Sequence, residues 1–134
     1  TTNLLGVIGL KAGVKWLLER GIDRIHEQEM RLMTLLRDGV KDIKGVTTYC
    51  QDDLARHIAV FPFNIVGFES DETGPLFDVD HDIACRTGLH CAPLVHEHLG
   101  TKQGAIRFSL GPFNTESDVR AAIDAVKDIA SLRS

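Results

Sequence analysis

The chain has few cysteines, and their number is odd. Cys50, Cys85 and Cys91 are its only three, and none of them forms a C-x-x-C pair. This pattern argues against a disulfide framework and against a zinc site, and it favours a reducing compartment. We therefore expect a cytoplasmic protein without a bound metal, in which Cys50 and Cys85 are packed core residues.

The chain also lacks an excess of positive charge and any long apolar run. Its formal net charge is −4, from 15 Lys and Arg residues against 19 Asp and Glu residues. The composition therefore gives no electrostatic basis for binding nucleic acid. No apolar run approaches the roughly 18 residues that a membrane-spanning helix needs, and there is no secretory signal. We expect neither a nucleic-acid nor a membrane partner.

What is present is typical of one globular domain with a single core. The chain has 134 residues, of which 43% are hydrophobic and 25% charged. Apolar residues that recur every three to four positions predict helices over residues 4–19 and 22–43. In the first of these, Gly6, Gly9 and Gly13 indicate close packing against another backbone. A capping box at Thr115 and Asp118 predicts a final helix.

The middle of the chain alternates short β-prone runs with turn residues. Pro62 indicates that its strand lies at a sheet edge or carries a bulge. Pro93 and Gly100 suit the first position and the left-handed stop of a short helix. The pattern predicts strands over residues 46–49, 58–66, 83–86 and 105–110, with short helices over 71–79 and 94–99. Together these elements predict an α+β fold, a small and mostly antiparallel sheet covered by helices.

Cys91 lies among residues that favour a nucleophilic thiolate. It belongs to the run RTGLHCAP (residues 86–93), beside His90, near Arg86 and just before Pro93. Cationic neighbours and helix N-termini lower a cysteine pKa from about 8.5 into the range of about 3.5–7.5. Arg86 would either favour the thiolate or anchor the turn, and His90 would either relay protons or pack the loop.

A second run, GAIRFSLGPFNT (residues 104–115), supplies Arg107. A guanidinium offers a planar fork that matches a carboxylate, although a structural ion pair is the ordinary role of a single arginine. We expect Ser109 and Asn114 to shape the backbone of this run. The histidines other than His90 are expected at the solvated surface: His26, His57, His81, His96 and His98.

These two runs and the opening TTNLLGVIGL (residues 1–10) resemble the C-terminal part of class V aminotransferase-fold enzymes. Within that group they are most similar to the cysteine desulfurases and selenocysteine lyases, whose catalytic cysteine lies in an R-x-G-x-x-C-A-x-P-like turn. Here the proline follows Ala92 directly, which is a small departure. The resemblance holds at three ordered places and so spans essentially the whole chain.

The resemblance implies a pyridoxal-phosphate enzyme that removes sulfur from L-cysteine, or selenium from selenocysteine, and leaves L-alanine. It implies that Cys91 is the nucleophile, becomes a persulfide and passes its sulfur to an acceptor protein. Arg107 would bind the substrate carboxylate, with Arg86 and His90 as further substrate-binding residues. Thr1 would reach the cofactor phosphate of the neighbouring subunit in a homodimer.

The resemblance also implies that the cofactor is held elsewhere. In the family, the Schiff-base lysine and the phosphate loop belong to a large N-terminal domain, and no lysine here lies in a matching motif. We therefore expect residues 1–134 to form a single C-terminal domain of a longer enzyme, one that alone holds no pyridoxal 5′-phosphate covalently and is inactive. Two alternatives stay open: another class V aminotransferase or lyase, and a standalone sulfur-carrier module.

Overall fold

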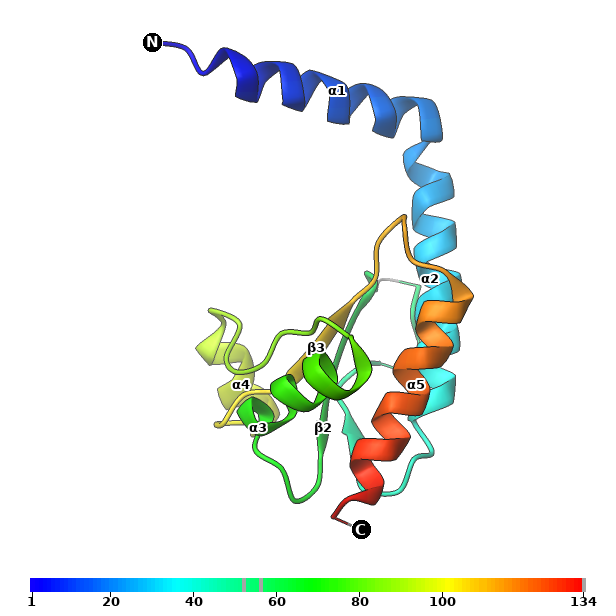
Figure 1. Ribbon diagram of the computed structural model, residues 1–134, viewed down its shortest axis with the longest axis vertical. Helices are drawn as coiled ribbons and strands as arrows, with labels where there is room; N and C mark the ends of the chain where they lie inside the picture. Colours follow the sequence, from blue (N-terminus) through cyan, green and yellow to red (C-terminus); the bar gives the residue numbers. More distant parts are fainter. Residues whose placement is uncertain (52, 56, 134) are drawn as a thin grey trace.

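The computed structural model describes residues 1–51, 53–55 and 57–133, and it confirms the α+β class. Two long helices come first, a three-stranded antiparallel sheet of order β1-β2-β3 forms the centre, and a long helix closes the chain (Figure 1). The elements in chain order are α1 (Leu4–Arg20), α2 (Ile22–Val40), β1 (Val46–Thr48), β2 (Val60–Ile65), α3 (Ser70–Pro75), the π-helical turn η1 (Leu76–Asp80), α4 (Pro93–Leu99), β3 (Ile106–Ser109) and α5 (Glu116–Ser131).

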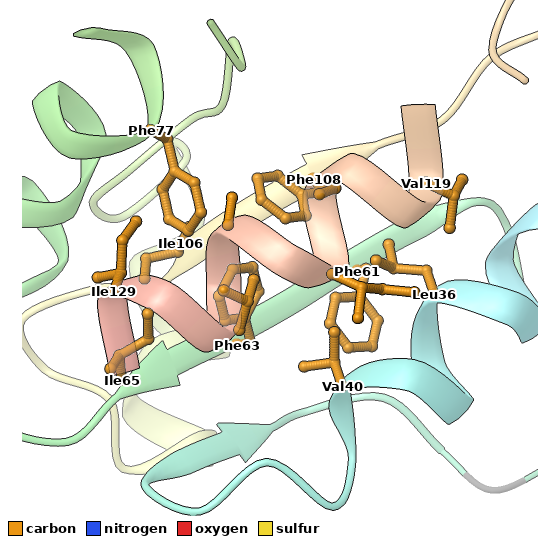
Figure 2. Close-up of a cluster of buried hydrophobic side chains, with 14 of the residues drawn as sticks. Leu36, Val40, Phe61, Phe63, Ile65, Phe77, Ile106, Phe108, Val119 and Ile129 are labelled. Atoms are coloured by element: carbon orange, nitrogen blue, oxygen red, sulfur yellow. The ribbon is translucent and has the colours of Figure 1, made fainter. Parts of the chain in front are cut away.

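The two faces of the sheet differ in chemistry. Phe61, Phe63 and Ile65 alternate along β2 with half-buried residues, and all three point into the core that α2 and α5 cover. Figure 2 shows these side chains packed with those of α2, α5 and β3. The Phe63 ring lies 5.1 Å from that of Phe108 on β3. Because side chains alternate along a strand, the neighbouring Arg107 belongs to the opposite face, away from α2 and α5.

Pro62 lies in the central strand, so the prediction of an edge or a bulge was wrong. Its carbonyl accepts a hydrogen bond from the Tyr49 N–H at 3.0 Å, so its own nitrogen faces the same side, toward β1. β1 ends at Thr48, one residue before Tyr49. The β1–β2 ladder therefore ends at the position of Pro62. The absence of an N–H on this proline removes little of the hydrogen bonding between the two strands.

α1 is a helix, as predicted, but among the described residues it does not pack closely against another backbone. It projects away from the sheet at the top of α2 (Figure 1), and a Cβ on Gly9 or Gly13 would have no neighbour within 4 Å in the part of the chain that the structure describes. Its C-terminal end is held by Trp16, whose ring lies 5.2 Å from that of Phe113. No helix in the described part of the chain is long and apolar enough to cross a membrane.

Candidate functional site

The loop that carries Cys91 lies along the outer edge of β3. Arg86 and Arg107 exchange two backbone hydrogen bonds, of 3.1 Å and 2.7 Å. The Ala105 N–H donates to the Gly88 carbonyl at 3.1 Å. The predicted strand over residues 83–86 is wrong, because only Arg86 of that segment forms a bridge to β3. From Arg86 to Gly88 the loop is fixed to β3 and to Ala105 just before it, and it then turns away toward Cys91.

Two glycines allow this close approach. Gly104 has φ +88°, and a Cβ on it would lie 2.4 Å from the carbonyl carbon of Gly88 and 2.5 Å from its oxygen. Those are backbone atoms of the loop, which cannot move aside without displacing the loop itself. The pair Gly88 and Gly104 therefore sets how closely the loop approaches the start of β3.

Gly104→Ala should destabilise the protein by about 2 to 4 kcal/mol, because strain at positive φ adds to the collision with Gly88. Gly100→Ala is the matched control: Gly100 has φ +72°, but a Cβ there meets none of the described residues within 4 Å. The control should lower the free energy of unfolding by only about 1 to 2 kcal/mol, because alanine is strained in the left-handed conformation. Chemical denaturation measures both, and equal losses would contradict the close approach of the two glycines.

Cys91 is exposed, and its backbone adopts an uncommon conformation. His90 has φ +52° and Cys91 has φ +59°, so two successive residues other than glycine lie in the left-handed region. Each such residue costs of order 1 kcal/mol, and this kind of strain tends to gather at functional sites. α4 begins at Pro93, two residues further on, and ends as predicted at Gly100 in the left-handed conformation.

Arg107 presents a guanidinium with unmet hydrogen-bonding capacity. Its Nε is buried, and the described part of the structure offers that atom no hydrogen-bond partner. Arg86 lies directly across the ladder as its backbone-paired neighbour. Among the described residues, neither arginine forms an ion pair with a carboxylate. Like charges directly opposite each other repel. The pair therefore suits an anionic group with two acceptor oxygens.

His90 is tied to Ala105, the residue directly before β3. Its Nε2 lies 2.9 Å from the Ala105 carbonyl oxygen. A carbonyl oxygen only accepts hydrogen bonds, so we assign the ring hydrogen of neutral His90 to Nε2. Partial burial lowers the pKa of His90, and repulsion from Arg107, His96 and Arg86 lowers it further, although the bond to Ala105 opposes this. His90 is therefore a neutral imidazole at pH 7.

His90 should make the stability depend on pH in a defined direction. Between its lowered pKa and about 6.5, the folded protein binds fewer protons on this ring than the unfolded chain does. The contribution of neutral His90 to the free energy of unfolding is therefore complete above about pH 6.5, and it is lost as the pH falls through the pKa of His90 in the folded protein. The free energy of unfolding of the wild type should fall in this window relative to that of His90→Gln. Parallel pH profiles would contradict the lowered pKa.

The remaining predicted site residues lie in different places. Arg86 is exposed at the start of the loop, and Thr1 is exposed at the free end of α1, far from α4 (Figure 1). The structure therefore brings His90, Arg86 and Arg107 together around β3, with Cys91 next to His90 in the same loop, and it leaves Thr1 outside this group. Asn114 shapes the backbone as expected, because its Oδ1 accepts from the Gly111 N–H at 2.8 Å.

The other two cysteines belong to the periphery of the core. Cys50 and Cys85 are half-buried and packed against the main hydrophobic cluster. Burial raises the pKa of the Cys85 thiol, and the negative charge of Asp78 raises it further. Cys85 is therefore a protonated thiol at pH 7, as the prediction of a packed core cysteine implies.

His96 was missed by the sequence analysis, which placed it at the solvated surface. It is buried, with 5% of its surface exposed, and its Nδ1 lies 2.8 Å from the Thr101 hydroxyl. One feature of the sequence could have predicted this burial. Gly100 ends α4 and reverses the direction of the chain, so Thr101 lies back against the last turn of the helix, which contains His96. His98, two residues away on the same helix, is exposed as expected.

Comparisons with known proteins find cysteine desulfurases among the relatives of this chain. The cysteine desulfurase CsdA of Escherichia coli (strain K12) is 34% identical over 127 residues, which cover 94% of this chain and 30% of that protein. A probable cysteine desulfurase of Pyrococcus abyssi is 31% identical over 135 residues, which cover 100% of this chain and 33% of that protein. The chain thus spans about a third of the length of these relatives.

The solved structures give the same result at the level of the fold. The apo cysteine desulfurase of Thermococcus onnurineus superposes with a TM-score of 0.91 and 30% identity, over 98% of this chain and 32% of that one. CsdA of Escherichia coli superposes with a TM-score of 0.86 and 32% identity, over 98% of this chain and 32% of that one. Residues 1–122 match the family described as Aminotransferase class-V. Because this match covers most of its length, the chain belongs to the class V aminotransferase family.

Proposed function

We propose that the chain is the C-terminal domain of a pyridoxal-phosphate-dependent cysteine desulfurase. Arg107 carries the proposal: its buried Nε has no partner in the described part of the structure, and it lies on the strand that holds the Cys91 loop. The relatives named above support the substrate, L-cysteine, because both are cysteine desulfurases by name. The same site would accept selenocysteine, which differs only in the chalcogen.

In this proposal Arg107 binds the substrate carboxylate through its planar fork, with Arg86 opposite it adding positive charge. When bound, pyridoxal 5′-phosphate carries the amino acid and accepts electron density from its carbon atoms. The Cys91 thiolate forms an S–S bond with the substrate sulfur. The Cβ–S bond breaks, and its electron pair goes to the carbon, which takes a proton and becomes the methyl group of alanine. The exposed Cys91 persulfide then faces an acceptor protein.

The residues of this chain fit the carboxylate of the substrate and do not supply the amine that holds such a cofactor. Its lysines lie in α1, just after α2, in the turn before β3 and in α5, and none belongs to the 86–93 loop or to β3. We therefore propose that a part of the enzyme outside residues 1–134 holds the cofactor, and that these residues alone are inactive. Thr1 would serve the neighbouring subunit of a homodimer.

The odd number of cysteines, with no C-x-x-C pair among them, also suits a reducing compartment, and we propose the cytoplasm. The function is tested by supplying L-cysteine to the intact enzyme and measuring alanine and transferable sulfur. A desulfurase gives the two in equal amounts without a keto acid. Turnover that requires a keto acid and releases no sulfur would assign the protein to the aminotransferases instead.

A further inference from the structure

A buried pair of polar side chains lies beneath the proposed nucleophile loop. His96 and Thr101 are both buried, and the His96 Nδ1 lies 2.8 Å from the Thr101 hydroxyl oxygen. The Thr101 N–H also donates to the His96 carbonyl at 2.9 Å. Side chain and backbone together therefore fix His96 in one position at the end of α4. Neither residue has a part in the chemistry proposed above.

The His96 ring meets the residue next to Cys91. The ring centroids of His96 and His90 lie 5.8 Å apart, with the ring planes inclined by 42°. On the other side, His90 donates through Nε2 to the Ala105 carbonyl at 2.9 Å. A continuous series of contacts thus runs from Thr101 through His96 and His90 to Ala105, directly before β3. It supports the strained turn in which His90 and Cys91 have φ +52° and +59°.

We propose that His96 is a positioning residue for Cys91. Held by Thr101, its ring keeps the His90 ring in the orientation that donates to Ala105, and the His90–Cys91 turn then retains its left-handed backbone. The inference depends on the proposed function in one respect: its effect on catalysis, which is to hold the Cys91 sulfur beside the carboxylate site. The contacts themselves require no substrate.

The charges around the His90 ring explain why it should be neutral. Arg107 on β3, Arg86 in the loop and His96 on α4 all act on His90. α3 brings the carboxylate of Asp71 close to Gly88, 3.6 Å from where a Cβ on that glycine would lie. A proton on the His90 imidazole adds positive charge near two guanidiniums, so its protonation weakens the support of the turn.

Thr101→Val tests the proposal in the 134-residue chain without cofactor, because valine keeps the shape of threonine and removes only its hydroxyl. Nuclear magnetic resonance reports the His90 ring tautomer, and hydrogen exchange reports the Ala105 amide, which donates to Gly88. In the wild type at pH 7.5, the Nε2–H tautomer of His90 should dominate. In Thr101→Val the two tautomers should mix, and the Ala105 amide should exchange about tenfold faster.

Thr101→Ser keeps the hydroxyl and should restore both signals, which separates positioning from simple packing. His98→Gln, on the exposed part of α4, is the matched control and should resemble the wild type. His96→Gln, which removes the ring contact, should reproduce the effect of Thr101→Val and serves if that variant does not fold. A wild-type His90 tautomer and wild-type Ala105 exchange in the folded Thr101→Val or His96→Gln variant would overturn the proposal. Neither readout depends on desulfuration, so the two proposals can fail separately.

Discussion

Cys91→Ser should lower alanine formation from L-cysteine by on the order of a thousandfold or more, because a serine hydroxyl is not ionised at neutral pH and cannot carry a persulfide. The side chain is exposed, so its replacement leaves no cavity in the core. Folding and cofactor absorbance of the intact enzyme should therefore be unchanged. The measurement is the rate of alanine release at saturating L-cysteine. Selenocysteine is a poor substrate for this test, because selenium leaves more easily.

Cys85→Ser and Cys50→Ser are the matched controls, since both thiols are half-buried and lie outside the loop. Both variants should retain turnover, with at most a modest loss of stability from placing a hydroxyl against the core. If the Cys91→Ser variant still desulfurated L-cysteine at the wild-type rate, Cys91 would have no part in the reaction. The enzyme would then be another class V aminotransferase or lyase in which this thiol has no role.

Arg107→Ala should lower kcat/KM for L-cysteine by about 10²- to 10³-fold, because a charge-assisted, two-point contact to the carboxylate is lost. Arg107→Lys keeps the charge and loses the planar fork, so it should still lose about tenfold or more. Most of either loss should appear as a raised KM, since the carboxylate is bound in the ground state and in the transition state alike. Steady-state kinetics of the intact enzyme provide the measurement.

Arg120→Ala is the matched control for Arg107. Arg120 lies on α5, with 67% of its side chain exposed, and pairs only loosely with Glu116 at 4.0 Å. Its replacement should leave the kinetics unchanged, because exposed ion pairs contribute little. If Arg107→Ala bound L-cysteine as tightly as the wild type, the unpartnered Nε would need another explanation and the carboxylate site would be wrongly placed.

The elements that are determined by local sequence were predictable. The capping box of α5 is present: the Thr115 hydroxyl accepts from the Asp118 N–H at 3.3 Å, and the Asp118 carboxylate accepts from the Thr115 N–H at 2.8 Å. Gly100 ends α4 as predicted. Capping contacts join residues only three apart, so the sequence alone contains all the groups involved.

The elements that depend on distant partners were not predictable. Whether Pro62 interrupts a ladder depends on where β1 stops, which is decided by the pairing of two strands. Residues 83–86 have β-prone side chains, but only Arg86 meets β3 before Gly88 and Gly104 fix the path of the loop. Likewise, the sequence shows that α1 carries glycines and apolar residues, but not what covers them.

The candidate site divides in the same way. Cys91 could be proposed from the residues beside it, because a thiol next to an imidazole is a local signal, and Arg107 could be proposed because its run resembles that of the family. The opposition of Arg86 and Arg107 follows from strand register, and the burial of His96 follows from the return of the chain at Thr101. Both are tertiary facts, and they are the features that give the site its electrostatics.

The most direct test follows one sulfur atom. The intact enzyme is mixed with an equal amount of sulfur-labelled L-cysteine and no acceptor, and then digested without reductant so that each cysteine-containing peptide is recovered separately. If the Cys91 thiol takes the sulfur, the label appears as a persulfide on the peptide that contains Cys91, in proportion to the alanine released. Alanine formed with the label on Cys50 or Cys85, or on no cysteine, would contradict the assignment of Cys91 as the sulfur acceptor.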